Sequence, residues 1–76
     1  MHQVEEKIID IISRKFHVAP DKIRPDLELR RDLKGSDLDL IELLVAIEKD
    51  CGVEIDSQRA SRVRTVRDAC QLAASA

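Results

Sequence analysis

The segment between Gly35 and Gly52 constrains the fold most, because it carries the start signal, the stop signal and the periodicity of one helix. Ser36 is a favoured N-cap residue, and Asp39 stands three positions later, where its side chain can return a hydrogen bond to the cap. Gly52 supplies the residue that commonly follows the last turn of a helix. The sequence therefore predicts a helix that begins just after Ser36 and ends before Gly52.

This helix has apolar residues on two nearly opposite faces. Five of them fall within one arc and form an ordinary core face: Leu40, Leu43, Leu44, Ile47 and Cys51. Leu38, Ile41 and Val45 form a second row, which is flanked by Glu42 and Glu48. A core helix does not need apolar residues there, so the row predicts a small docking surface. The alternative is a chance alignment of exposed apolar side chains.

The first part of the chain predicts a helix followed by a long connection. Helical spacing of apolar residues extends from Gln3 to Phe16, and the connection then runs from His17 to Gly35. Scattered apolar residues are expected to hold this connection against the core: Val18, Ile23, Leu27, Leu29 and Leu33. A connection of this length is more often functional than idle.

The last third of the chain predicts two more helices. Ser57 is expected to cap a brief helix that contains Ala60 and Val63, and Thr65 is expected to cap the final one. The final helix shows apolar residues at helical spacing: Val66, Ala69, Cys70 and Leu72. The prediction is one all-α domain over residues 1–76, a four-helix bundle with a long first loop and a short third helix.

Charge is unevenly distributed along the chain, although the net charge is only −2. Between positions 37 and 56 there are seven acidic residues and one lysine, which would steer a basic partner to this region, unless they simply form a solvated helix face. The net negative charge and the single aromatic residue argue against nucleic-acid binding. A small DNA-binding protein would need a basic recognition helix, whereas the arginines after position 56 are spread over a turn and two short helices: Arg59, Arg62, Arg64 and Arg67.

Catalytic and metal-binding patterns are absent from the sequence. His2 and His17 have no evident orienting partner, so the chain is not expected to be an enzyme. Cys51 and Cys70 are too few for a disulfide scaffold or a zinc cluster and are interpreted as small core residues, and no metal site is expected. The N-terminal segment lacks the apolar run of a secretory signal, which favours the cytoplasm. A monomer is expected, and no membrane insertion.

The chain as a whole resembles the acyl carrier proteins, over nearly every residue. The strongest part is LRRDLKGSDLDLIELLVAIEKDCGVEID, residues 29–56, and RVRTVRDACQLA, residues 62–73, is similar to the family's last helix with its preceding turn. The resemblance implies a four-helix acyl-carrier-like bundle that carries acyl groups as thioesters on a 4'-phosphopantetheine arm and does no catalysis itself. It also implies a role in fatty-acid, lipid or polyketide synthesis.

The attachment site departs from the family pattern. In the family the arm is joined through a phosphodiester to the serine of an Asp-Ser-Leu motif at the start of the second helix. This chain reads Gly35-Ser36-Asp37-Leu38-Asp39, which places Asp37 where the family has its serine. Three interpretations follow: Ser36 carries the arm, the chain is an unmodified relative, or Asp37 is a substitution or engineered change that blocks loading. Ser36 could also serve only as the helix cap.

The resemblance also implies a partner surface on the second helix. The expected partners are a phosphopantetheinyl transferase and the acyl-transferring or synthase enzymes, which present basic patches. The residues expected to meet them are Asp37, Leu38, Asp39, Ile41, Glu42, Val45 and Glu48. The alternative function is a carrier-like protein-interaction module that keeps this surface and carries no arm.

Overall fold

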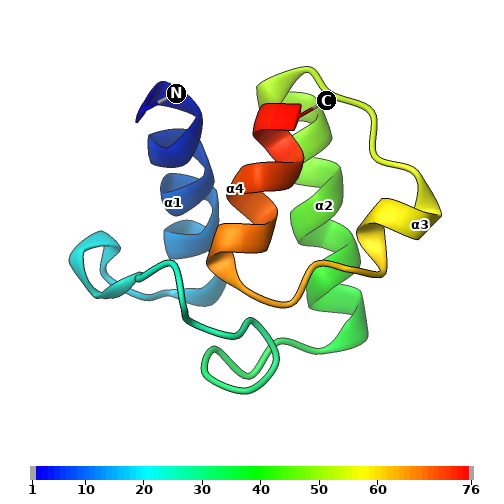
Figure 1. The fold of residues 1–76 in the computed structure, drawn as a ribbon. Coiled ribbons are helices and arrows are strands. Elements are labelled where there is room, and N and C mark those ends of the chain that lie inside the picture. The colour runs from blue at the N-terminus through cyan, green and yellow to red at the C-terminus, as the bar shows by residue number, and fades with distance from the viewer. Residues whose placement is uncertain (1, 76) are drawn as a thin grey trace.

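The computed structural model describes residues 2–75 and confirms the all-α prediction (Figure 1). Its elements, in chain order, are α1 (His2–Phe16), the 3-10 turn η1 (Pro20–Lys22), α2 (Asp37–Cys51), the short α3 (Ser57–Ala60) and α4 (Val66–Ser75). α1, α2 and α4 pack against one another, and α3 lies on the outer side of α2. The described part of the chain is therefore the predicted bundle with a long first loop and a short third helix.

The core is aliphatic and draws on every long helix. Its buried side chains are Ile8, Ile11, Ile12, Ile23, Leu29, Leu43, Ile47, Val66, Ala69 and Ala73. The inner face predicted for α2 is confirmed, because Leu43 and Ile47 are fully buried and the other three members pack against the core. Cys51 and Cys70 also pack against the core, but each is only half-buried, and their thiols are free. Burial raises the pKa of the Cys70 thiol to about 11, with smaller contributions from Glu5 and Cys51.

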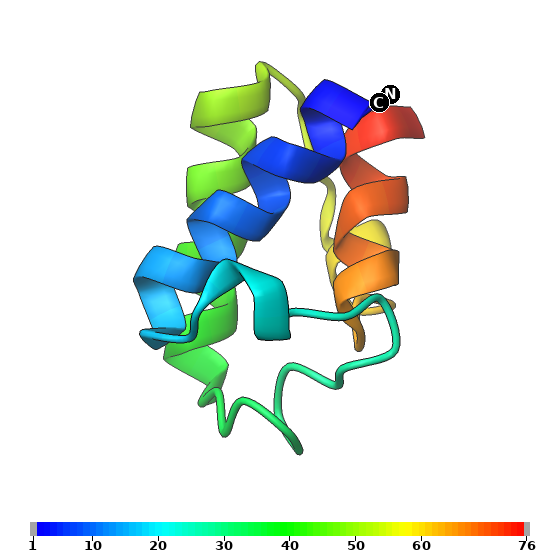
Figure 2. The same ribbon diagram turned by 90° about the vertical axis from the view of Figure 1, so that its left-hand side faces the viewer.

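The connection between α1 and α2 is held down as predicted. Ile23 and Leu29 are buried in the core, and the other three predicted anchors are half-buried. The backbone of the connection also bonds to the segment that leads into α4, with N–H donations from Leu29 to the Arg64 carbonyl at 2.8 Å and from Val66 to the Leu27 carbonyl at 3.0 Å. In Figure 2 the connection runs below the ends of α1 and α4. These contacts hold the end of the loop, and therefore the start of α2, in place.

The predicted N-cap of the third helix is wrong. Asp56, not Ser57, is the N-cap: its carboxylate accepts the Arg59 N–H at 2.8 Å, and Ser57 is the first helical residue. The helix ends at Ala60, so Val63 lies beyond it. Aspartate and serine are about equally good caps, so the carboxylate one residue earlier can take the place predicted for the serine hydroxyl.

The end of α2 agrees with its sequence. Gly52 adopts a left-handed backbone with φ of 66°, and its N–H donates to the Glu48 carbonyl at 3.0 Å.

Within residues 2–75 no helix has the length and apolar character needed to cross a bilayer.

Candidate functional site

The first turn of α2 is organised by a reciprocal pair of hydrogen bonds. Ser36 Oγ accepts the Asp39 N–H at 3.1 Å, and Asp39 Oδ2 accepts the Ser36 N–H at 3.0 Å. This is the capping box expected from the sequence, with aspartate in the place of the usual glutamate. Ser36 is exposed, so its hydroxyl faces solvent at the end of a helix where the backbone N–H groups and the dipole favour an anion.

Gly35 allows the loop to approach this turn closely. Its N–H donates to the Leu29 carbonyl at 2.9 Å, and a Cβ at this position would lie 3.0 Å from that carbonyl oxygen and 3.0 Å from the Phe16 ring. Only glycine fits this approach without displacing its neighbours. The sequence did not reveal this approach, because the contact depends on Phe16, which is distant in the chain.

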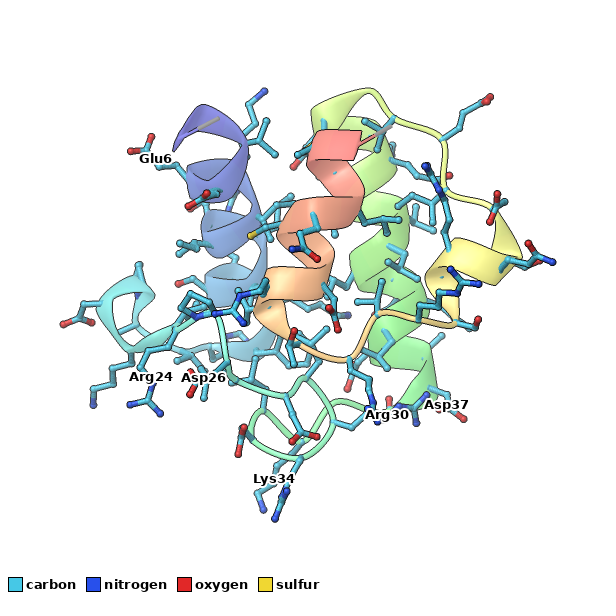
Figure 3. The ribbon with its side chains drawn as sticks, in the orientation of Figure 1. Glu6, Arg24, Asp26, Arg30, Lys34 and Asp37 are labelled. Carbon is cyan, nitrogen blue, oxygen red and sulfur yellow. The ribbon has the colours of Figure 1, made fainter. Side chains whose placement is uncertain are left out.

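Asp37 is the first residue of α2 and pairs with Arg30. Its exposed carboxylate points outward and forms an ion pair with Arg30 Nη1 (Figure 3). Figure 3 also shows Lys34, from the same loop, pointing away from this pair. The structure thus balances the charge of Asp37 at the position where the family pattern has serine. The sequence did not reveal Arg30, since nothing local fixes which loop cation reaches Asp37.

Lys15 joins the end of α1 to the first two turns of α2. Its ammonium group pairs with Glu42 and lies 3.7 Å from Asp39 Oδ1. Glu42 chiefly raises the pKa of Lys15 above its ordinary value of 10.5. The Ser36 N–H and then its hydroxyl lower the pKa of Asp39 from 3.8, and Lys15 adds to this. The capping box is therefore connected to α1 by an ion pair that sequence reasoning also missed.

The predicted outer row of α2 is confirmed as exposed. Leu38, Ile41 and Val45 expose 62%, 58% and 48% of their surface, and these values place all three in solvent rather than in the core. The acids around them have partners within the chain. Besides the pairs of Asp37, Asp39 and Glu42, the carboxylate of Glu48 accepts the Ile55 N–H at 2.9 Å. The apolar row is thus bordered by carboxylates that are already partly neutralised or hydrogen-bonded.

A groove of about 530 Å³ lies beside this site, between α2 and α3. Its apolar walls include Leu40, Leu44 and Ala60, and Arg30, Asp37 and Arg64 also line it. The start of α2 therefore combines an exposed hydroxyl, a flanking ion pair and an adjoining groove with apolar walls and two cationic side chains.

Comparison with known proteins identifies the family. Residues 6–73 match the family model described as "Phosphopantetheine attachment site". The acyl carrier protein of Nitratidesulfovibrio vulgaris (strain DP4) is 39% identical over 66 residues, covering 87% of this chain and 87% of that protein. The acyl carrier protein of Treponema denticola is 38% identical over 69 residues, covering 91% of this chain and 88% of that protein. The acyl carrier protein of Thermosynechococcus vestitus is 35% identical over 66 residues, covering 87% and 82%. The chain belongs to the acyl carrier protein family.

Family membership confirms the resemblance and the carrier function, in which the protein transports and does not catalyse. At the level of individual residues, the structure places Ser36 at the N-cap and Asp37 one position into the helix. The family's arm fits at Ser36, where an exposed hydroxyl stands at the positive end of a helix. It does not fit at Asp37, because a carboxylate has no hydroxyl with which to form the phosphodiester.

Proposed function

We propose that the protein carries acyl groups as thioesters on a 4'-phosphopantetheine arm attached to Ser36, and that it serves fatty-acid, lipid or polyketide synthesis. The observation that supports this most directly is the exposed Ser36 hydroxyl at the N-cap of α2. In loading, Ser36 Oγ forms a bond to the phosphorus of the arm, the bond from that phosphorus to the adenosine bisphosphate part of coenzyme A breaks, and the hydroxyl proton passes to a base of the transferase. The arm then supplies the thiol that holds the acyl group.

The neighbouring Asp37 does not prevent this chemistry electrostatically. A bare carboxylate would repel the incoming phosphate, but Arg30 pairs with it. At the first helical position the carboxylate also interacts favourably with the helix dipole. The shift of the hydroxyl by one residue is small, since consecutive Cα atoms lie about 3.8 Å apart.

Mass spectrometry tests the attachment. The protein is incubated with coenzyme A and a phosphopantetheinyl transferase, and the control omits the transferase. We expect one added arm on the intact chain, and fragmentation is expected to place it on Ser36. An unchanged mass with a transferase that loads another carrier in the same tube would refute loading, and an arm on another residue would refute the site.

One observation favours a second function, a carrier-like interaction module without an arm: Asp37 stands where the family pattern has the modified serine. The double substitution Ser36→Asp with Asp37→Ser restores the family order and separates the two functions. Loading of both chains supports the carrier, whereas loading of the exchanged chain alone supports the module.

We also propose that the transferase and the acyl-transferring enzymes dock on the exposed row of α2, with contributions from Asp37, Asp39, Glu42 and Glu48. Ile41→Ala is expected to raise the KM for the carrier in the loading reaction by about tenfold, because the few interface residues whose truncation costs more than about 1 kcal/mol cluster near the centre, and Ile41 is the middle member of the row. Gln71→Ala, on the exposed side of α4, is the matched control. Equal KM values for the two variants would exclude Ile41 from the interface.

The cytoplasmic location and the monomeric state stay predictions. Three exposed apolar side chains form a surface much smaller than the roughly 800 Å² per partner of a standard interface, which supports a monomer. Light scattering at increasing concentration should give a mass near 8.6 kDa throughout.

A further inference from the structure

We propose that Arg30 is a positioning residue for the arm: once Ser36 carries the phosphodiester, the guanidinium bridges the Asp37 carboxylate and an oxygen of the phosphate. The inference rests on the proposed attachment at Ser36. It gives a function to the ion pair of Arg30 with Asp37. This ion pair was not predicted from the sequence, and it lies at the position where the chain departs from the family motif.

The Arg30 guanidinium lies close to the proposed attachment site. Arg30 Nη1 already reaches the carboxylate of Asp37, and Asp37 follows Ser36 directly, so both side chains leave the same turn of α2. Figure 3 shows the Arg30 side chain approaching Asp37 from the loop. A phosphate on Ser36 Oγ would begin one residue from a guanidinium that is already in place.

Arg30 has more donors than one carboxylate can use. A guanidinium has five N–H groups in a fixed planar fork, and even a bidentate carboxylate engages only two of them. The contact of Arg30 with Asp37 is made through Nη1. Arg30 is exposed, so the remaining donors can turn to a second anion without being desolvated. The fork suits phosphate as well as carboxylate oxygens, which an ammonium group does less well.

The other cations near this turn are less well placed than Arg30. Lys15 is held between two carboxylates, Glu42 and Asp39. Lys34 is closer to Ser36 in sequence but points away from α2 in Figure 3. Arg64 lines the same groove as Arg30 and Asp37, but its backbone belongs to the segment before α4. Of these cations, Arg30 is therefore the one that pairs with the residue directly after Ser36.

The bridge would balance the negative charges of Asp37 and the phosphodiester. Loading adds a second negative charge beside Asp37, as it does beside the aspartate of the family's Asp-Ser-Leu motif, but here the order of the two residues is exchanged. A guanidinium placed between the two anions converts their repulsion into two attractions. The arm would then leave Ser36 in a preferred direction, along the groove that Arg30 also lines.

Phosphorus NMR of the loaded protein tests the bridge without any activity measurement. The samples are the loaded wild type, Arg30→Gln, Arg30→Lys and the matched control Lys34→Gln. We expect Arg30→Gln to shift the phosphodiester resonance clearly, Arg30→Lys to shift it less, and Lys34→Gln to leave it at the wild-type position. In 1 M salt, where the screening length falls to about 3 Å, the difference between wild type and Arg30→Gln should shrink.

The outcomes separate this inference from the proposed function. A loaded wild type whose resonance is the same as in Arg30→Gln and Lys34→Gln overturns the bridge and leaves the carrier function intact. A wild type that receives no arm overturns both. Arg30→Lys covers the case in which Arg30→Gln fails to fold, since it keeps the charge that balances Asp37, and circular dichroism of the unloaded variants checks their helix content.

Discussion

Helices α2 and α4 begin with the same device in two different surroundings. At the start of α2, Ser36 and Asp39 exchange hydrogen bonds of 3.1 and 3.0 Å. At the start of α4, the Thr65 hydroxyl accepts the Asp68 N–H at 3.1 Å, and Asp68 Oδ2 accepts the Thr65 N–H at 3.1 Å. In each case a hydroxyl residue is followed three positions later by aspartate, so local geometry does not distinguish the two sites.

The surroundings do distinguish them. The pair at α4 is partly buried and is fastened to the long loop by backbone hydrogen bonds on both sides of Thr65. The pair at α2 is exposed and lies among the ion pairs of Lys15 and Arg30. One capping motif can therefore only stabilise a helix where it is partly buried and, where it is exposed, also leave its hydroxyl open to a modifying enzyme. Exposure decides which role is available.

The largest expected difference between the two hydroxyls is in loading. Ser36→Ala should abolish addition of the arm, because the nucleophilic oxygen is removed. Thr65→Ala should be loaded to completion, since the α4 hydroxyl is not the proposed attachment site. Intact-mass measurements on the two variants and the wild type provide the readout. Residual loading of Ser36→Ala would mean that another side chain accepts the arm.

The second largest difference is expected in the stability effects of substituting the residues that precede the two hydroxyls. Gly35→Ala is expected to destabilise the fold by about 1–3 kcal/mol, because the added Cβ meets the Leu29 carbonyl and the Phe16 ring at 3.0 Å. Arg64→Ala, immediately before Thr65, is the control and should change stability by less than about 0.5 kcal/mol, since its side chain is exposed. Urea unfolding measures both. Equal midpoints would show that the loop relaxes around the new methyl group.

Removal of the capping hydroxyl should lower the free energy of unfolding by less than Gly35→Ala does, and by different amounts at the two helices. Thr65→Ala is expected to cost about 1 kcal/mol of unfolding free energy, and Ser36→Ala less, because water can replace the hydroxyl at an exposed helix end more readily than at a partly buried one. Thr65→Ser keeps the acceptor and is the control. Urea unfolding of the three variants ranks them. A larger loss for Ser36→Ala would show that the α2 cap stabilises the bundle more than its exposure suggests.

The sequence predicted the parts of the site that depend on local chemistry. The cap at Ser36, its partner Asp39 and the stop at Gly52 follow from bonds between residues at most a few positions apart. The exposed row of Leu38, Ile41 and Val45 followed from the helical period, because a helix with one buried face must turn the opposite face to solvent.

Contacts that depend on the tertiary arrangement could not be predicted in this way. Arg30 and Lys15 reach α2 from the loop and from α1, and several other cations were equally available in the sequence. The N-cap of α3 was predicted one residue too late for a different reason. Asp56 and Ser57 are adjacent and both are good caps, so the local pattern did not decide between them.

The smallest expected difference concerns acid stability. The pKa of Asp39 is lowered chiefly by the Ser36 N–H. Burial alone would raise the pKa of Asp68, but the N–H groups of Arg64 and Thr65 outweigh it, and the net pKa is lowered. In both cases the unfolded chain binds the proton more readily, so stability is present above the ordinary pKa of 3.8 and is lost as the pH falls through the lower folded pKa.

Salt should separate the two carboxylates in that acid range. Asp68 is held mainly by backbone and hydroxyl groups, and the charge of Arg64 is the smallest of its contributions, whereas Asp39 lies 3.7 Å from the Lys15 ammonium, and an exposed ion pair is screened in 1 M salt. Urea midpoints between pH 2.5 and 6 should therefore show that the flattening of the acid loss by Asp68→Asn changes little between low and high salt. Asp39→Asn should flatten it less at high salt than at low salt, because screening has already removed part of the wild-type effect. Identical salt responses of the two variants would mean that Lys15 does not help to lower the pKa of Asp39. The difference between the two helix starts would then come from exposure and not from this ion pair.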